Sequence, residues 1–176
     1  MATKKKQKPV VAVVMGSDKD AGTMAEATKI LQEFKVEHEV HVISAHRTPN
    51  RCRTFSRGAA RRGIKVIIAG AGKAAHLAGV IASQTQLPVI GVPLDAGMKG
   101  LDALLATVQM PRGVPVASMA VGGSGAANAA LFAIGMLALN DSRLARRLTA
   151  FRLRQKVEVS RRSRQVAREL GGKVGR

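Results

Sequence analysis

The chain has 176 residues, 46% of them hydrophobic, which suits one globular domain that buries its core without disulfides or metals. Its formal charge of +18 suggests nucleic-acid binding until it is mapped: residues 1–9 carry four lysines and no acid, residues 143–176 carry a net +10, and residues 10–142 keep only +4. We therefore expect two solvated basic extensions, and the absence of Trp and Tyr excludes the aromatic platforms typical of single-strand binders.

Hydrophobic patterns predict five strands that alternate with helices. The strands are expected at 10–15, 39–44, 66–70, 88–92 and 114–121, and the helices at 24–34, 49–62, 74–84, 101–108 and 126–139, followed by a long arginine-rich helix from Asp141 that frays at Gly171. Such alternation predicts a three-layer α/β/α fold, a doubly wound parallel sheet of the flavodoxin-like type. Residues 10–142 would form the catalytic domain, 1–9 a disordered basic extension, and 143–176 a basic helix and tail.

An apolar run, the N-terminal residues and the single cysteine indicate the cellular compartment. The apolar run 126–139 is too short to span a bilayer and indicates a buried or subunit-interface helix, so no membrane contact is expected. Residues 1–9 lack the apolar core of a secretory signal. The only cysteine, Cys52, cannot form an intrachain disulfide and is predicted to be a semi-buried helix residue. These observations favour the cytoplasm.

Two histidine-bearing loops follow successive predicted strands. Ser44 to Pro49 places His46 beside Arg47, and Ala69 to Leu77 contains His76. Because the carboxyl ends of parallel strands meet at one edge of a sheet, we expect the two imidazoles to share one site. An imidazole there can move protons near neutral pH.

The loop from Gly16 to Asp20 joins the first strand to its helix. Its free N–H groups and the positive end of the helix dipole suit a phosphate, and a carboxylate there could hold ribose hydroxyls. Ser17 or Asp20 could equally be a plain helix cap.

Cofactor and metal motifs are weak. The Gly70 to Gly72 segment resembles a dinucleotide fingerprint but lies on the third strand, and the residue after Lys73 is Ala, which excludes a nucleoside-triphosphate P-loop. His38 and His41, three apart on a strand, face opposite sides, and we expect His38 to be an exposed strand-edge residue and His41 a satisfied structural one. The pattern predicts acid/base chemistry on a phosphorylated, sugar-bearing heterocycle without metal or cofactor.

Six segments in order, spread over about Val10 to Arg147, resemble the signature of the PurE family. They are 14–17 with Asp20, 44–49 (SAHRTP), 69–72 with 74–77, 91–93, 109–116 (QMPRGVPV) and 126–130. The resemblance implies a 5-(carboxyamino)imidazole ribonucleotide mutase of purine biosynthesis, assembled as a homo-octamer with sites at subunit junctions. The resemblance further implies that the enzyme moves a carboxylate from the exocyclic nitrogen to carbon 4 of the imidazole by release and recapture of carbon dioxide.

Carried over by position, the resemblance assigns catalysis to His46 and His76. His46 would be the acid/base, and His76 would line the carboxylate pocket. The segment 109–113 would close the site from a neighbouring subunit. The residues implied to bind substrate are Ser17, Lys19, Asp20, Ser44, Arg47, Gly70, Ala71, Gly72 and Lys73.

Some positions depart from the family pattern. Lys19 and Ala21 replace a Ser and a bulky residue, Lys73 a Gly and Ala78 a Pro, and Gly123 stands where a larger polar residue is common. The sequence around His76 looks more like the mutase branch of the family than the carboxylase branch. Direct carboxylation of aminoimidazole ribonucleotide by carbon dioxide, a lyase activity, is the close variant of the expected reaction. Two alternatives stay open: a carboxy-lyase relative for another phosphoribosyl or nucleotide substrate, and an inactive scaffold whose basic tails bind nucleic acid.

Overall fold

The computed structural model describes residues 8–172, so most of the extension predicted at 1–9 and the end of the C-terminal tail lie outside the described residues. The elements in order are β1 (Val11–Met15), a 3-10 turn (Asp18–Asp20), α1 (Ala21–Glu33), β2 (His38–Val42), α2 (Pro49–Arg62), β3 (Val66–Gly72), α3 (Leu77–Ala82), β4 (Val89–Leu94), a second 3-10 turn (Met98–Gly100), α4 (Leu101–Val108), β5 (Ala117–Ser118), α5 (Gly123–Ala138) and α6 (Ser142–Glu169). Residues 1–136 and 137–176 form two compact units, which are described separately.

The five strands form one parallel sheet in the order β2-β1-β3-β4-β5, which confirms the predicted doubly wound fold. The chain moves outward from β1 to β2 and then crosses back to β3. The order therefore reverses at β1, and in such sheets ligands bind outside the carboxyl ends of the strands at this switch point.

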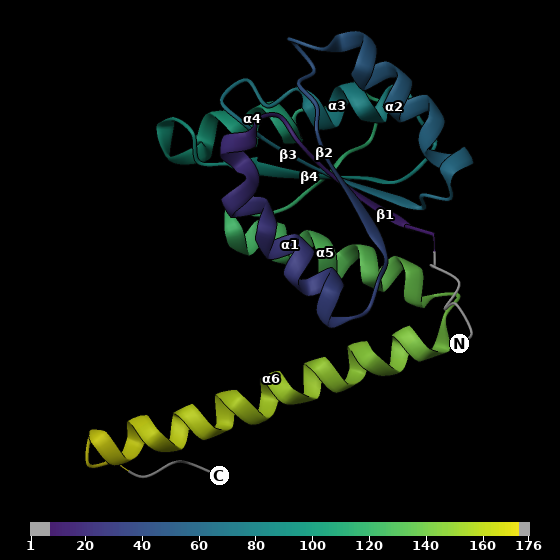
Figure 1. Ribbon diagram of the computed structural model, residues 1–176. Helices are drawn as coiled ribbons and strands as arrows, with labels where there is room; N and C mark the ends of the chain where they lie inside the picture. Colours follow the sequence, from purple (N-terminus) through teal and green to yellow (C-terminus); the bar gives the residue numbers. More distant parts are fainter. Residues whose placement is uncertain (1–7, 173–176) are drawn as a thin grey trace. The chain divides into compact units, whose positions relative to one another are not determined.

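Helices cover both faces of the sheet. In Figure 1, α2, α3 and α4 lie on one side, and α1 and α5 lie on the other. Alternating strand residues supply the two halves of the core, because successive side chains point to opposite faces. Ala12, Val14 and Ile67 pack with Phe55 of α2 and Ile81 of α3 in one buried cluster. A strand covered on both faces must be apolar throughout, which explains the fully buried run of β1.

Several element bounds match the predicted ones. Helix α2 begins at Pro49, whose fixed φ suits a first turn, and ends at Gly63, which has φ 101°. Helix α4 has the predicted bounds. Cys52 is more buried than predicted, at 0% exposure, and this burial raises the pKa of its thiol.

Other bounds differ from the predicted ones. Strand β3 continues to Gly72 because its last residues pair with β4 as far as Leu94. Helix α3 consequently begins only at Leu77, and the segment that carries His76 is a turn. Strand β5 contains two residues, Ala117 and Ser118, instead of the eight predicted.

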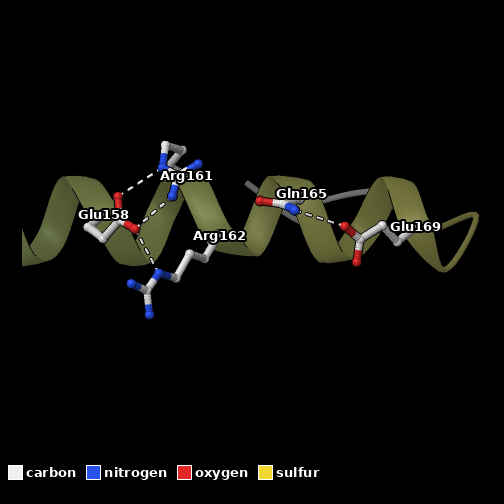
Figure 2. A network of polar contacts seen from close by, with 5 residues as sticks. All are labelled: Glu158, Arg161, Arg162, Gln165 and Glu169. Atoms are coloured by element: carbon white, nitrogen blue, oxygen red, sulfur yellow. Dashed lines mark hydrogen bonds and ion pairs between the residues drawn. The ribbon is translucent and has the colours of Figure 1, made fainter.

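Helix α6 is 28 residues long, which corresponds to about 42 Å. Asp141 caps it by accepting hydrogen bonds from the N–H groups of Arg143 and Leu144. In its second half, Glu158 accepts hydrogen bonds from Arg161 and Arg162 (Figure 2). Within residues 8–172, no helix is both long and apolar enough to cross a membrane.

Candidate active site

The three predicted site loops meet at the carboxyl ends of β1, β2 and β3. Strand β1 lies between β2 and β3 in the sheet, so the two histidine loops flank the loop of residues 16–20. The backbone ties this loop down, because the Gly16 N–H donates to the Gly70 carbonyl at 3.1 Å. The Gly16 carbonyl faces the other neighbour and accepts from the Arg47 guanidinium at 3.4 Å.

The loop after β1 is a reciprocal capping box. The Ser17 N–H donates to Asp20 Oδ2 at 3.0 Å, and the Lys19 N–H donates to Ser17 Oγ at 3.3 Å. Burial raises the pKa of Asp20, whereas the Ser17 hydroxyl lowers the pKa of the exposed Asp18 by donating to its carboxylate. The cap predicted as an alternative to a ligand role is therefore present, and the side chains still face the cleft described below.

The loop after β2 is held by its own hydroxyls. Thr48 Oγ1 accepts from the Ser44 N–H at 3.1 Å and donates to the Ser44 carbonyl at 2.8 Å. Ser44 Oγ accepts from the Arg47 N–H at 3.1 Å and from Arg47 Nε at 3.4 Å. This double turn exposes His46 and Arg47 while fixing the backbone from which they project.

The two histidines meet directly. His46 Nε2 lies 2.9 Å from His76 Nδ1, and the rings are nearly perpendicular at an interplanar angle of 81°. One ring donates and the other accepts, which requires a single hydrogen between the two nitrogens. The other ring nitrogens, His46 Nδ1 and His76 Nε2, have no hydrogen-bond partner among residues 8–172, so they can bind a substrate.

The loop after β3 approaches other backbone closely. A Cβ on Gly72 would lie 2.5 Å from Ala96 Cβ, so only glycine fits there. Lys73 follows with φ 55°, the left-handed conformation that favours glycine. Its side chain passes Gly97 and, within the described part of the chain, has no ion-pair partner. A strained, exposed lysine at a cleft is typical of a functional position.

These loops enclose a cleft of about 610 Å³. Every residue predicted to take part lines it except Gly70 and His76. His76 reaches the cleft through its bond to His46, and Gly70 is buried with its carbonyl bonded to Gly16. Three fixed cations line the wall (Lys19, Arg47 and Lys73) against two carboxylates (Asp18 and Asp20), which suits an anionic guest.

Sequence reasoning missed one wall of this cleft. Ala96, in the loop after β4, lines it, and the only signal was that this loop also follows the carboxyl end of a strand. A larger hollow of about 840 Å³ lies at the amino end of β4, around Pro88 and Gly113. Arg57 is its only charged residue, so acid/base chemistry belongs to the smaller cleft.

The remaining histidines lie away from the cleft. His38 is half-buried, with Nδ1 3.0 Å from the Val36 carbonyl oxygen. His41 packs on Phe55, but its buried Nε2, 3.2 Å from Glu39 Oε1, lacks hydrogen-bond geometry, so the prediction of a satisfied histidine is wrong at this atom. Residues 8–172 contain no group of three or more His, Cys, Asp or Glu side chains that could hold a metal ion.

Comparison with known proteins identifies the family of this chain. A family model described as AIR carboxylase matches residues 10–158. An N5-carboxyaminoimidazole ribonucleotide mutase of Mycobacterium tuberculosis is 50% identical over 97% of both chains, and one of Escherichia coli is 51% identical over 85% of this chain and 89% of its own. The crystal structure of Treponema denticola PurE has the same fold, with a TM-score of 0.79 and 22% identity over 90% of this chain and 98% of that one. The chain therefore belongs to the AIR carboxylase family.

Proposed function

We propose that this protein is an N5-carboxyaminoimidazole ribonucleotide mutase, an isomerase of purine biosynthesis that acts without metal or cofactor in the cytoplasm. The observation that carries the proposal is the hydrogen-bonded pair of His46 and His76 at a cleft lined by three cations. Relatives with this name are about 50% identical over most of the chain.

Proton transfer by the pair accounts for the reaction. Protonated His46 gives its proton to the exocyclic nitrogen as the bond from that nitrogen to the carboxylate carbon breaks, which releases carbon dioxide and leaves aminoimidazole ribonucleotide. Carbon 4 of the imidazole then bonds to the carbon dioxide, and neutral His46 removes the carbon 4 proton. The enzyme returns to its starting state, since one proton is given and one is taken.

His76 positions the acid/base. Its Nδ1, 2.9 Å from His46 Nε2, fixes the ring and leaves His46 Nδ1 for the substrate. We therefore expect His46→Asn to abolish turnover and His76→Asn to reduce it, because the His46 ring would lose the bond that holds it.

The cations on different loops of the cleft would bind different groups of the substrate. Ser17, Lys19 and Arg47 lie around the loop after β1, where two cations and a hydroxyl favour the phosphate, and Asp20 would hold the ribose. Lys73 belongs to the loop after β3, beside Ala71 and Gly72, whose backbone would line the carboxylate pocket. Ser44 contributes by holding Arg47 in place.

The site is completed by a second subunit in a homo-octamer. Segment 109–113 does not line the cleft of its own chain, although the family resemblance assigns it to a site. Helix α4 exposes Leu101, Leu105 and Val108 at 51%, 50% and 49%, and their spacing places them on one face, which suits burial against another copy. Native mass spectrometry of the wild type and of Leu105→Lys would test the assembly: the substitution should yield smaller species.

A labelled turnover assay tests the function. The purified protein is mixed with substrate that carries ¹³C in its carboxyl group, in unlabelled bicarbonate, and the product is followed by NMR. A mutase gives product labelled at the new carboxyl group, and His46→Asn gives none, whereas His38→Asn, outside the site, keeps full turnover. Unlabelled product formed from aminoimidazole ribonucleotide and bicarbonate would identify a direct carboxylase instead. No conversion by the wild type would refute the proposal.

A further inference from the structure

Helix α6 concentrates charge that the cleft does not use. Over Ser142–Glu169 it carries nine arginines and one lysine against two acids. All ten cationic side chains belong to exposed residues. A run of charge is usually a solvated surface, so its distribution around the helix decides whether it has a further role.

The distribution is one-sided. At about 100° per residue, seven arginines fall within a sector of about 100°, and the other three cations fall outside it. We call this sector the arginine stripe; its members are Arg143, Arg146, Arg147, Arg154, Arg161, Arg164 and Arg168. The off-stripe cations are Arg152, Lys156 and Arg162. Both acids, Glu158 and Glu169, also lie outside the stripe, so it presents a single sign of charge along about 38 Å.

The arginines of the stripe lie close enough together to repel one another. Pairs such as Arg143 with Arg147, and Arg164 with Arg168, are four residues apart and repel each other. Acidic side chains relieve the repulsion locally, at two points of the stripe: Asp141 Oδ1 lies 3.8 Å from Arg143 Nε, and Glu158 is bonded to Arg161. Glu158 also bonds the off-stripe Arg162, and Glu169 bonds Gln165 (Figure 2). An extended polyanion along the stripe would relieve the repulsion over its whole length.

Two properties of the helix favour nucleic acid over a lipid surface. Its opposite side is not a continuous apolar face, because Gln155 and Arg162 interrupt the stripe of Leu148, Val159 and Val166. A membrane-surface helix needs such a face. The cations are almost all arginine, whose planar fork binds phosphate oxygens in pairs.

We propose that α6 binds the phosphate backbone of duplex nucleic acid through the arginine stripe, without base recognition. The stripe length matches about one helical turn of a duplex, roughly 34 to 36 Å. This activity is independent of the cleft and adds an interaction surface to the mutase. Because phosphate contacts release counterions, binding should weaken steeply with salt.

Two triple variants of the full-length protein test the proposal. One changes Arg161, Arg164 and Arg168 to Gln, and the control changes Arg152, Lys156 and Arg162 to Gln. Each removes three charges from α6 and one arginine partner of Glu158, so helix stability and net charge stay matched. Circular dichroism checks their helix content, and fluorescence anisotropy measures binding to DNA and RNA duplexes of about 24 base pairs between about 50 and 200 mM salt.

The wild type should bind both duplexes, and the stripe variant should bind at least about tenfold more weakly than the control, with a salt slope smaller by about 2 to 3. Binding of only one duplex type, by the stripe, would restrict the partner to DNA or to RNA and still support the inference. Equal weakening in both variants would show diffuse attraction and overturn it. No duplex binding at the lowest salt, or binding to anionic vesicles alone, would also overturn it.

Discussion

Lys73→Gly separates backbone strain from ligand binding at the cleft. Lys73 has φ 55°, a left-handed conformation that costs a residue with a Cβ about 1 to 2 kcal/mol. Glycine removes this cost but loses about 0.5 to 1 kcal/mol more conformational entropy on folding. The net gain is about 0.5 to 1 kcal/mol, which should raise the melting temperature by about 1 to 4 °C.

The same substitution should weaken substrate binding. The Lys73 ammonium is exposed at the cleft wall and has no ion-pair partner within residues 8–172, so a substrate carboxylate would be its first. A charge-assisted contact at a partly solvated site contributes about 1 to 2 kcal/mol. We therefore expect KM to rise by about 5- to 30-fold.

Two companion variants sharpen the assay. Lys35→Gly is the matched control, because Lys35 also has φ 55° but lies outside the cleft, in the turn after α1. It should raise the melting temperature by a similar amount and leave turnover unchanged. Lys73→Met keeps the strain and removes the charge, so it should lose affinity without gaining stability. Faster turnover or an unchanged KM in Lys73→Gly would refute a carboxylate-binding role for Lys73.

Three further predictions concern the cap, the glycines and α6. Burial raises the pKa of Asp20, so its carboxyl group stabilises the fold below its ordinary pKa, and this contribution is lost as pH rises through the folded value. Asp20→Asn should therefore lower turnover at pH 7 without lowering the melting temperature at that pH. A drop in melting temperature of several degrees would contradict this. Gly125→Ala places a Cβ against the Ala120 carbonyl oxygen, and this clash should lower the free energy of unfolding by about 2 kcal/mol or more. Gly135→Ala in the same helix meets no other atom and should raise the free energy of unfolding by about 1 kcal/mol. Denaturant unfolding of both variants should show opposite signs, and equal effects would exclude the clash. Hydrogen bonds from Arg161 and Arg162 lower the pKa of Glu158 to about 2. The stabilisation from these ion pairs is therefore fully present above the ordinary pKa of a glutamate and is lost as pH falls through about 2. An NMR titration midpoint near 4 would show that the pairs do not form in solution.

Local chemistry made much of the fold predictable. Pro49 and Gly63 mark the ends of α2, because one suits a helical first turn and the other a left-handed cap. Predictions failed where tertiary pairing decided the outcome. The start of α3 depends on how far β3 pairs with β4, and the local sequence 74–77 does not carry this information.

The site was predictable in its members but not in its contacts. The loops holding His46, Arg47 and His76 could be assigned to the carboxyl ends of strands from the sequence. The contact between the two imidazoles depends on the position of β1 between β2 and β3 in the sheet. This strand order is a property of the tertiary fold and cannot be read from the loop sequences. The lysine at position 73 gives no sign of its left-handed backbone, and the signal present in the sequence was that Lys73 stands where the family pattern has a Gly.

Single-turnover conversion of N5-carboxyaminoimidazole ribonucleotide by the wild type, His46→Asn and His38→Asn tests the central claim most directly. The two substitutions are chemically identical, and only His46 bonds to His76 at the cleft. We predict that the wild type and His38→Asn form the carbon 4 carboxylate at equal rates and that His46→Asn forms none above the uncatalysed rate. Conversion by His46→Asn at the rate of the wild type would contradict the account.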